Sequence, residues 1–349
     1  MTRQTWSTNC TLDDIAARIA RSPNTAVLTH TKPDGDAIGS SLALVRAIAA
    51  SRHTSASSVA SPAEAWYTGP MPIWFGSVQR QTRMRSLDGG DQLPPHEPDL
   101  VVIVDTGSWT QLDRLADWVR AFEGDVIVID HHLAGDADVA AMRYIDTGAA
   151  AACEPVAGVC TRLLNVASPA RLNESIAEPL YLGLATDTGW FRHSNVSPAV
   201  FRLAGDLVEA GVQHEQLFQN IEQRDRAARL GLMARALTSL EFALGGAAAI
   251  MTLTQKDFEE TGAAPQDVGG IVDLPRCVES VRVSALLTEQ RSTGEPLTKI
   301  SMRSKGGPGM IDVNVVSRAF GGGGHAQAAG ARTNLSLAQA KAKLIEVMS

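Results

Sequence analysis

The sequence contains few cysteines, no long apolar run and no excess of positive charge. Four cysteines occur among 349 residues, without a Cys-x-x-Cys pair, so we expect neither a disulfide framework nor a zinc site built from thiolates. No apolar run approaches the roughly 20 residues needed to cross a bilayer. The first residues also lack the apolar core of a signal peptide. We therefore expect a cytoplasmic protein that does not act at a membrane.

The charge of the chain is unevenly distributed. A formal net charge of −7 argues against a protein that coats long nucleic acid. Residues 296–332 nevertheless contain five basic residues and only one acidic residue, Asp312. An acidic region that holds metal ions and a basic region that holds phosphate would produce this division. Ordinary solvated surface charge would produce it equally well.

Three short apolar runs predict the core of an α/β fold. Residues 25–30 form a short run with β-branched residues, and residues 99–105 and 125–130 are nearly continuous runs of valine and isoleucine, as in strands buried on both faces of a parallel sheet. Helical patterns at 37–50 and 112–122 follow the first two runs. This alternation predicts an open, mostly parallel sheet flanked by helices.

The rest of the chain predicts a second, smaller α/β domain. Residues 154–240 show a helical pattern, and strand-like runs return after the glycines at 245–246. Helical segments, among them 267–275, lie between these later strands. With about 150 residues per domain, we expect a catalytic domain, a helical linker and a C-terminal domain, at 1–215, 216–245 and 246–349.

Carboxylates and imidazoles follow the predicted strands at the point where each strand ends. They are His30, with Asp34 and Asp36 in the next turn, then Asp105, then Asp130, His131 and His132, and finally Asp187 after a later apolar run. In open α/β sheets, ligands bind beyond the carboxyl ends of the strands. One such aspartate is usually a turn former or helix cap, but the whole set is hard to explain in that way.

Six of these residues have the donor chemistry of a metal site. Mixed oxygen and nitrogen ligands with excess carboxylate suit Mn²⁺ best, with Mg²⁺, Co²⁺ or Fe²⁺ as alternatives. Six protein ligands exceed what one metal with an open position takes, whereas two neighbouring metals serve displacement at phosphorus. The six are His30, Asp34, Asp36, Asp105, His131 and Asp187.

These motifs resemble the four motifs of the DHH phosphoesterase superfamily. Asp-His-His at 130–132, His-x-x-x-Asp-x-Asp at 30–36 and the single Asp105 and Asp187 occur in the family's order. Gly-Gly-Gly-Gly-His at 321–325 is similar to the signature of the associated C-terminal domain. The length and the two-part organisation resemble the branch of nanoRNases and 3′-phosphoadenosine-5′-phosphate (pAp) phosphatases. That branch includes phosphodiesterases of linear or cyclic dinucleotides.

The resemblance implies a role for each matching residue of the first domain. His132 would face the scissile phosphate as a hydrogen-bond donor or proton shuttle, and Asp130 would orient the loop or a ligand imidazole. The two metals would share Asp105. Their ligands would be His30, Asp34 and Asp105 for one metal, and Asp36, Asp105, His131 and Asp187 for the other.

The resemblance also implies that the C-terminal domain binds the rest of the substrate. Gly322, Gly323 and Gly324 would let backbone amides approach a phosphate, and His325 would contact the nucleotide. Arg303 would bind a terminal phosphate and help to neutralise charge on the reacting group. The active site would then lie in the cleft between the domains. A glycine hinge and a surface arginine are the structural alternatives.

The function implied by the resemblance is hydrolysis of short substrates by a water that two metals activate. Short RNA or DNA oligonucleotides and dinucleotides would be cleaved to mononucleotides by a 3′–5′ exonuclease, and pAp would lose its 3′-phosphate. Alternatives are a cyclic dinucleotide phosphodiesterase, a manganese-dependent inorganic pyrophosphatase, a single-strand DNA exonuclease and an inactive nucleotide-binding module. The resemblance further implies a homodimer.

Overall fold

The computed structural model describes residues 5–53, 63–87, 98–292 and 294–349. The chain divides into two compact units, Met1–Gln223 and Arg224–Ser349, each with its own sheet. This boundary falls within the linker expected at 216–245, whose limits remain a prediction. A helix with the length and apolar composition to cross a membrane does not occur in the described segments.

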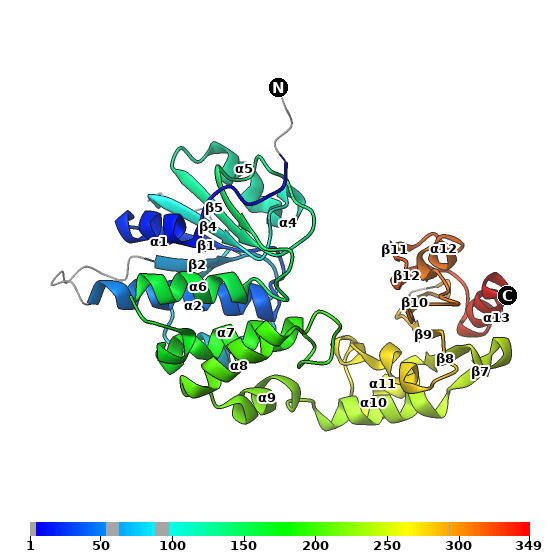
Figure 1. Ribbon diagram of the computed structural model, residues 1–349. Coiled ribbons are helices and arrows are strands. Elements are labelled where there is room, and N and C mark those ends of the chain that lie inside the picture. The colour runs from blue at the N-terminus through cyan, green and yellow to red at the C-terminus, as the bar shows by residue number, and fades with distance from the viewer. Residues whose placement is uncertain (1–4, 54–62, 88–97, 293) are drawn as a thin grey trace. The chain divides into compact units, whose positions relative to one another are not determined.

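The first unit is built on a wholly parallel sheet in the order β3-β2-β1-β4-β5-β6 (Figure 1). The three predicted runs form its centre, and every residue of β1 and β4 is buried, which explains their continuous apolar character. The strands are β1 (Thr25–Leu28), β2 (Ala63–Tyr67), β3 (Met84–Ser86), β4 (Leu100–Val104), β5 (Asp125–Asp130) and β6 (Met142–Ile145).

Helices cover both faces of this sheet (Figure 1). One face packs against α1 (Leu12–Arg21), α2 (Gly35–His53), α6 (Cys153–Leu163) and α7 (Glu174–Asp187), with α8 (Pro198–Glu209) and α9 (His214–Glu222) beyond them. The other face packs against α4 (Trp109–Leu112), the 3₁₀ turn η1 (Asp113–Leu115) and α5 (Ala116–Ala121). The single helix predicted at 112–122 is therefore wrong in detail, because Asp113 has a left-handed φ of 50° that interrupts it.

The sheet order creates a crevice at the carboxyl ends of β1 and β4. These strands are neighbours, but the chain leaves β1 for α2 on one face and leaves β4 for α4 on the other. Ligands of open α/β sheets bind at such a switch point, because the two connections diverge and leave room between them.

Close packing of α2 against α7 brings a second helix to this crevice. A Cβ at Gly39 of α2 would lie 2.3 Å from the carbonyl oxygen of Pro179, and a Cβ at Gly183 of α7 would lie 2.7 Å from Oδ1 of Asp36. Only glycine permits this approach. The C-terminal end of α7 therefore reaches the same edge as the start of α2.

The second unit contains a mixed sheet in the order β11-β12-β10-β9-β8-β7. Its strands are β7 (Glu241–Ala243), β8 (Ala248–Leu253), β9 (Val283–Glu289), β10 (Thr298–Ser304), β11 (Gly323–His325) and β12 (Ala328–Thr333). One face packs against α12 (Val313–Arg318) and α13 (Leu337–Met348). Over β8 and β9 the other face packs against α10 (Ala227–Thr238) and the 3₁₀ segment η5 (Ile271–Cys277), near α11 (Gln255–Thr261).

Several short helical segments complete the description, and two of them correct one expectation. The helical segment expected at 267–275 consists of the 3₁₀ turns η4 (Pro265–Val268) and η5, because Gly270 between them has a φ of 77°. The remaining short elements are α3 (Phe75–Gln79), η2 (Pro169–Arg171) and η3 (Leu244–Gly246). The predicted fold class, an open parallel α/β sheet followed by a smaller α/β domain, is confirmed.

Candidate active site

The structure brings all six predicted ligands to the crevice of the first sheet. Ligand atoms of His30, Asp34 and Asp105 lie within 4.8 Å of one another, and so do those of a second group, Asp36, His131 and Asp187. Five of the six follow β1, β4 or β5, as predicted. Asp187 is the last residue of α7, so it comes from a helix end.

Both histidines are held so that the same ring nitrogen faces the carboxylates. The Nδ1 atom of His30 lies 3.0 Å from the carbonyl oxygen of Thr31, and the Nδ1 atom of His131 lies 3.3 Å from that of Ala149. A proton on Nδ1 satisfies each contact and leaves Nε2 as the coordinating atom. The backbone therefore selects the tautomer that a metal ligand needs.

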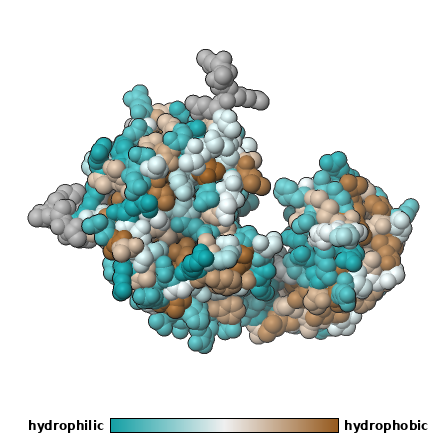
Figure 2. All heavy atoms as spheres, viewed as in Figure 1, coloured by the Kyte–Doolittle hydropathy of each residue, from teal (hydrophilic) through white to brown (hydrophobic). Residues whose placement is uncertain are grey.

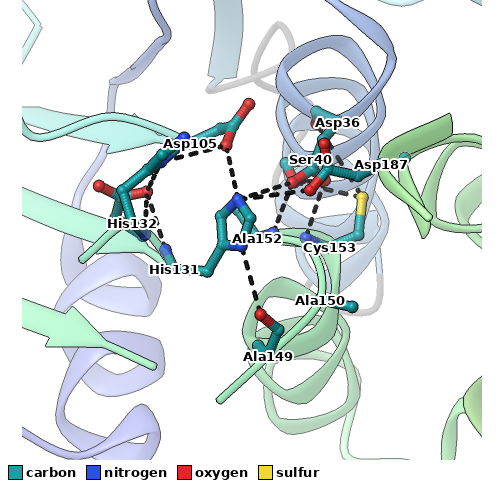
Figure 3. Close-up of polar contacts among 12 residues, drawn as sticks. Asp36, Ser40, Asp105, His131, His132, Ala149, Ala150, Ala152, Cys153 and Asp187 are labelled. Atoms are coloured by element: carbon teal, nitrogen blue, oxygen red, sulfur yellow. Dashed lines mark hydrogen bonds and ion pairs between the residues drawn. The ribbon is translucent and has the colours of Figure 1, made fainter. Parts of the chain in front are cut away.

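Asp105 connects the two groups of ligands. Its Oδ2 atom lies 3.5 Å from Nε2 of His30. Its Oδ1 atom lies 3.5 Å from Nε2 of His131 (Figure 3). The same His131 nitrogen is 3.5 Å from Oδ2 of Asp187 and 3.9 Å from Oδ2 of Asp36. The geometry therefore fits a carboxylate shared between two ions, with one imidazole on each side.

The backbone of Asp105 is held in an uncommon conformation. Its φ of 59° lies in the left-handed region, which aspartate tolerates better than most residues. Its amide donates to the carbonyl oxygen of Ile129 on β5. Residues held in sparsely populated backbone regions often occur at functional sites, where neighbouring structure maintains them.

The electrostatics of the cluster require cations. Burial and the neighbouring Asp105 and Asp187 raise the pKa of Asp36, and burial raises the pKa of Asp187 to about 6. Burial alone would lower the histidine pKa values, but the carboxylates outweigh it, raising the pKa of His30 to about 10 and that of His131 to about 9. Four carboxylates balance the charge of two divalent cations. The donor set thus fits a centre for two divalent metals.

His132 and Asp130 form a hydrogen-bonded pair beside the cluster. Nδ1 of His132 lies 2.7 Å from Oδ1 of the fully buried Asp130, and this contact raises the pKa of His132. The backbone amides of His131 and His132 also point to that oxygen. The His132 side chain is 45% exposed, which leaves its Nε2 atom accessible to a substrate. This is the arrangement of an oriented proton donor.

The last three residues of the C-terminal motif, Gly323–His325, form the edge strand β11. β11 pairs with β12, and the register places His325 opposite Ala328, which in turn lies opposite Arg303 of β10. Side chains at these paired positions share one face of the sheet. The structure thus brings Arg303 and His325 to the same face of the second unit.

At two of the predicted phosphate-binding glycines, the backbone of β12 comes too close for a side chain. A Cβ at Gly322 would lie 2.1 Å from the carbonyl oxygen of Gly330, and one at Gly324 would lie 2.5 Å from that of Ala328. Gly323 is exposed, and a Cβ there would meet Oδ1 of Asn314 only at 4.0 Å, an ordinary van der Waals contact. The alternation shows why the run is so glycine-rich.

Comparisons with known proteins agree with this geometry. The DHH family N-terminal domain matches residues 24–184, and the DHHA1 domain matches residues 245–349. The bifunctional oligoribonuclease and PAP phosphatase NrnA of Thermus thermophilus is 31% identical over 323 residues, which cover 92% of this chain and 88% of the relative. This chain belongs to the DHH family. The family consists of phosphoesterases, so the chain is a hydrolase.

Two further proteins are similar to this DHH chain over most of its length. The probable bifunctional oligoribonuclease and PAP phosphatase NrnA of Streptococcus mutans is 27% identical and covers 91% of this chain and 92% of its own. The crystal structure of an exopolyphosphatase-related protein from Bacteroides fragilis superposes with a TM-score of 0.79 at 22% identity. It covers 97% of this chain and 95% of that one, and supports the fold.

The DHH sequence motifs did not reveal what holds Asp36 in place. The amides of Ala152 and Cys153, at the start of α6, donate to its two carboxylate oxygens at 2.5 and 3.0 Å, and the Ser40 hydroxyl donates to Oδ1 at 3.2 Å (Figure 3). The N-terminal end of a helix favours a negative charge. These donors fix both oxygens of a buried ligand.

Trp6 was also missed, although it contacts the loop that carries the Asp-His-His motif. Its indole nitrogen donates to the carbonyl oxygen of His132 at 3.0 Å. A Cβ at Gly107 would lie 1.7 Å from its ring, and one at Gly135 would lie 2.6 Å away. The ring therefore lies between the loop after Asp105 and the loop after His132. No local sequence pattern could reveal this contact across 126 positions.

Proposed function

We propose that this chain hydrolyses short oligoribonucleotides to mononucleotides from the 3′ end and removes the 3′-phosphate of pAp. The observation that carries the proposal is the convergence of six metal-ligand candidates on Asp105, beside the accessible His132. The relatives named as bifunctional oligoribonuclease and PAP phosphatase, which match over most of the chain, support this choice of substrates.

The metals are best matched by Mn²⁺. Four carboxylates and two imidazoles form a donor set of intermediate hardness, which suits Mn²⁺ better than the all-oxygen sites typical of Mg²⁺. When bound, two such ions lower the pKa of water and neutralise charge on the phosphoryl oxygens. His30, Asp34 and Asp105 would hold one ion, and Asp36, Asp105, His131 and Asp187 the other.

His132 acts on the reacting phosphate through Nε2. Asp130 accepts a hydrogen bond from the Nδ1–H group of His132, which fixes the ring plane. By raising the pKa of His132, it also keeps the ring protonated closer to neutral pH. The Nε2–H group then donates to a phosphoryl oxygen or transfers its proton to the leaving oxygen.

The second unit holds the remainder of the substrate. Arg303 presents a planar fork that matches a phosphate, and His325 lies on the same face with its ring exposed. Gly323 offers backbone without a side chain next to them. We further propose that the protein acts as a homodimer, which sedimentation velocity would test, and that it works in the cytoplasm.

A substrate panel with the metal-loaded enzyme tests the proposal. It contains RNAs of two to 24 nucleotides labelled at the 5′ end, pAp, linear and cyclic di-AMP, and pyrophosphate, each with Mn²⁺. We expect fast cleavage of two- to five-nucleotide RNAs and of pAp, slow cleavage of the 24-mer and none of pyrophosphate. Cleavage of pyrophosphate or of cyclic di-AMP alone would overturn the proposal, and so would an Asp105→Asn variant that retained full activity.

A further inference from the structure

One face of β10 exposes a row of polar side chains. The strand alternates between buried Thr298, Ile300 and Met302, which belong to the interior, and Lys299, Ser301 and Arg303, which are exposed or half-buried. The polar residues lie on the face opposite α12 and α13. On the second unit, Figure 2 shows teal and white surface, which marks hydrophilic to intermediate residues, beside tan and brown patches.

Two cations face each other at one end of this row. The register places Lys299 directly opposite Arg332 of β12, and both side chains are exposed. Like charges at opposed positions of an antiparallel pair destabilise the sheet. Among the residues that the structure describes, no carboxylate forms an ion pair with either side chain. The pair therefore carries an uncompensated positive charge that an anion would relieve.

A cavity of about 390 Å³ lies beside this pair. It is lined by Lys299, Ser301, Gly321, Gly322, Gly330 and Arg332, with neighbouring backbone. Gly330 lies opposite Ser301 and has no side chain, so no side chain of β12 fills the space beside the two cations at this position. Within the described residues, the Ser301 hydroxyl forms no hydrogen bond to another protein group. The cavity thus offers two cations and a hydroxyl group, which are the donors that a phosphate needs.

We propose that Lys299, Arg332 and Ser301 form a second phosphate subsite for an oligonucleotide. The proposal rests on the function given above, in which Arg303 and His325 hold one nucleotide. Lys299 is four residues from Arg303 on the same strand face, which is about 13 Å at the usual strand rise. A mononucleotide bound at Arg303 does not extend to Lys299, whereas a chain of three or more nucleotides places a further phosphate there.

This subsite makes binding depend on substrate length. Short chains with three to five nucleotides contact both ends of the face, while pAp and dinucleotides contact only the Arg303 end. Two exposed cation–phosphate contacts correspond to roughly a fivefold to tenfold gain in affinity. Longer chains gain no further contacts from strands β10 and β12, because Lys299 and Arg332 are the last cations on this face of these two described strands.

The test compares kinetic constants of the full-length, Mn²⁺-loaded protein and a Lys299→Gln/Arg332→Gln variant. We expect KM to rise roughly fivefold to tenfold for three- to five-nucleotide RNA, with KM for pAp and kcat for all substrates unchanged. The slope of log(kcat/KM) against log[salt] for the pentamer should become shallower by about 0.7, as expected for one phosphate that is no longer neutralised. The melting temperature should not fall, since the substitutions remove a like-charge pair.

A matched control removes two positive charges elsewhere on the second unit. Lys341→Gln/Lys343→Gln changes two cations of α13, which packs against the opposite face of the sheet, and should leave the length dependence unchanged. An equal rise of KM for pAp and pentamer, or no rise for either, would overturn the subsite. A wild-type protein that cleaves neither substrate would instead contradict the proposed function, so the two failures are distinguishable.

Discussion

At the scale of single residues, Asp105 connects the two groups of ligands. Each of its oxygens faces a different histidine at 3.5 Å, so we expect its removal to affect both proposed metal ions at once. We expect Asp105→Asn to lower kcat/KM by at least about a thousandfold and to lower the bound metal per chain. Asparagine also tolerates the left-handed φ, so the backbone should be retained.

Metal content and kinetics, measured after gel filtration in Mn²⁺, check the Asp105 prediction. The exposed Asp138 lies on the same unit and pairs with the Trp109 indole, so Asp138→Asn serves as the control that should retain metal and activity. An Asp105→Asn protein with two bound metals and normal turnover would contradict the shared role.

His132 separates proton transfer from metal binding. We expect His132→Gln to lower kcat by about 10²–10⁴-fold with the metal affinity unchanged. Asp130→Asn should instead change the pH dependence of kcat. It removes the acceptor that raises the pKa of His132, so the decline of kcat at high pH should begin at a lower pH. An unchanged pH profile in Asp130→Asn would show that His132 is not the titrating donor.

The sequence made the convergence of the candidate ligands predictable, but not the groups that hold them in place. His30, Asp36 and Asp105 could be placed together because parallel strands end at one edge of a sheet. The contacts of the Ala152 and Cys153 amides with Asp36 could not be predicted. Backbone amides carry no sequence signal, and these two lie 116 and 117 positions from Asp36.

At the scale of elements, residues 6–9 connect an outer strand to the catalytic loop. Thr8 and Asn9 exchange hydrogen bonds with β6 and its flanks, and Trp6 then bonds to the His132 carbonyl. We expect Trp6→Phe to lose one hydrogen bond, which amounts to about 1 kcal/mol, and to lower kcat several-fold while KM for pAp changes little. Turnover kinetics and thermal melting check both parts.

The Trp6 prediction needs a control variant in which a different tryptophan is replaced by phenylalanine. Trp118→Phe serves this purpose, because Trp118 lies on α5, where its ring contacts Phe122 and Trp66 and not the loop. If both variants lowered the melting temperature equally and neither changed kcat, Trp6 would be a packing residue only.

Elements were predictable where one residue pattern dominated. The buried runs at β4 and β5 were located to within a residue because both of their faces are apolar. The predicted helix at 112–122 failed at Asp113, where a left-handed residue interrupts it without a proline or glycine signal. β11 was missed because glycines have little strand preference, and the strand exists through its pairing with β12.

At the scale of the whole molecule, the metal centre couples stability to pH. Without metal, His30 and His131 have pKa values of about 10 and 9, above the usual 6.5. Their protonated forms therefore stabilise the fold at and below about pH 6.5, and this contribution is lost as pH rises toward 9–10. Metal ions compete with these protons, because the ligand is the neutral imidazole.

The stabilisation by Mn²⁺ should consequently grow with pH. At a free concentration 100 times the dissociation constant, one ion adds about 2.7 kcal/mol, which corresponds to a rise in melting temperature of about 5–10 °C. We expect this rise to be small at pH 6, where protons occupy both imidazoles and part of the Asp187 population, and largest near pH 9. Calorimetry of chelator-treated protein, with and without Mn²⁺ at three pH values, measures it. Asp138→Asn should behave as wild type and Asp105→Asn should lose the rise, whereas a rise independent of pH would show that the imidazoles are not ligands.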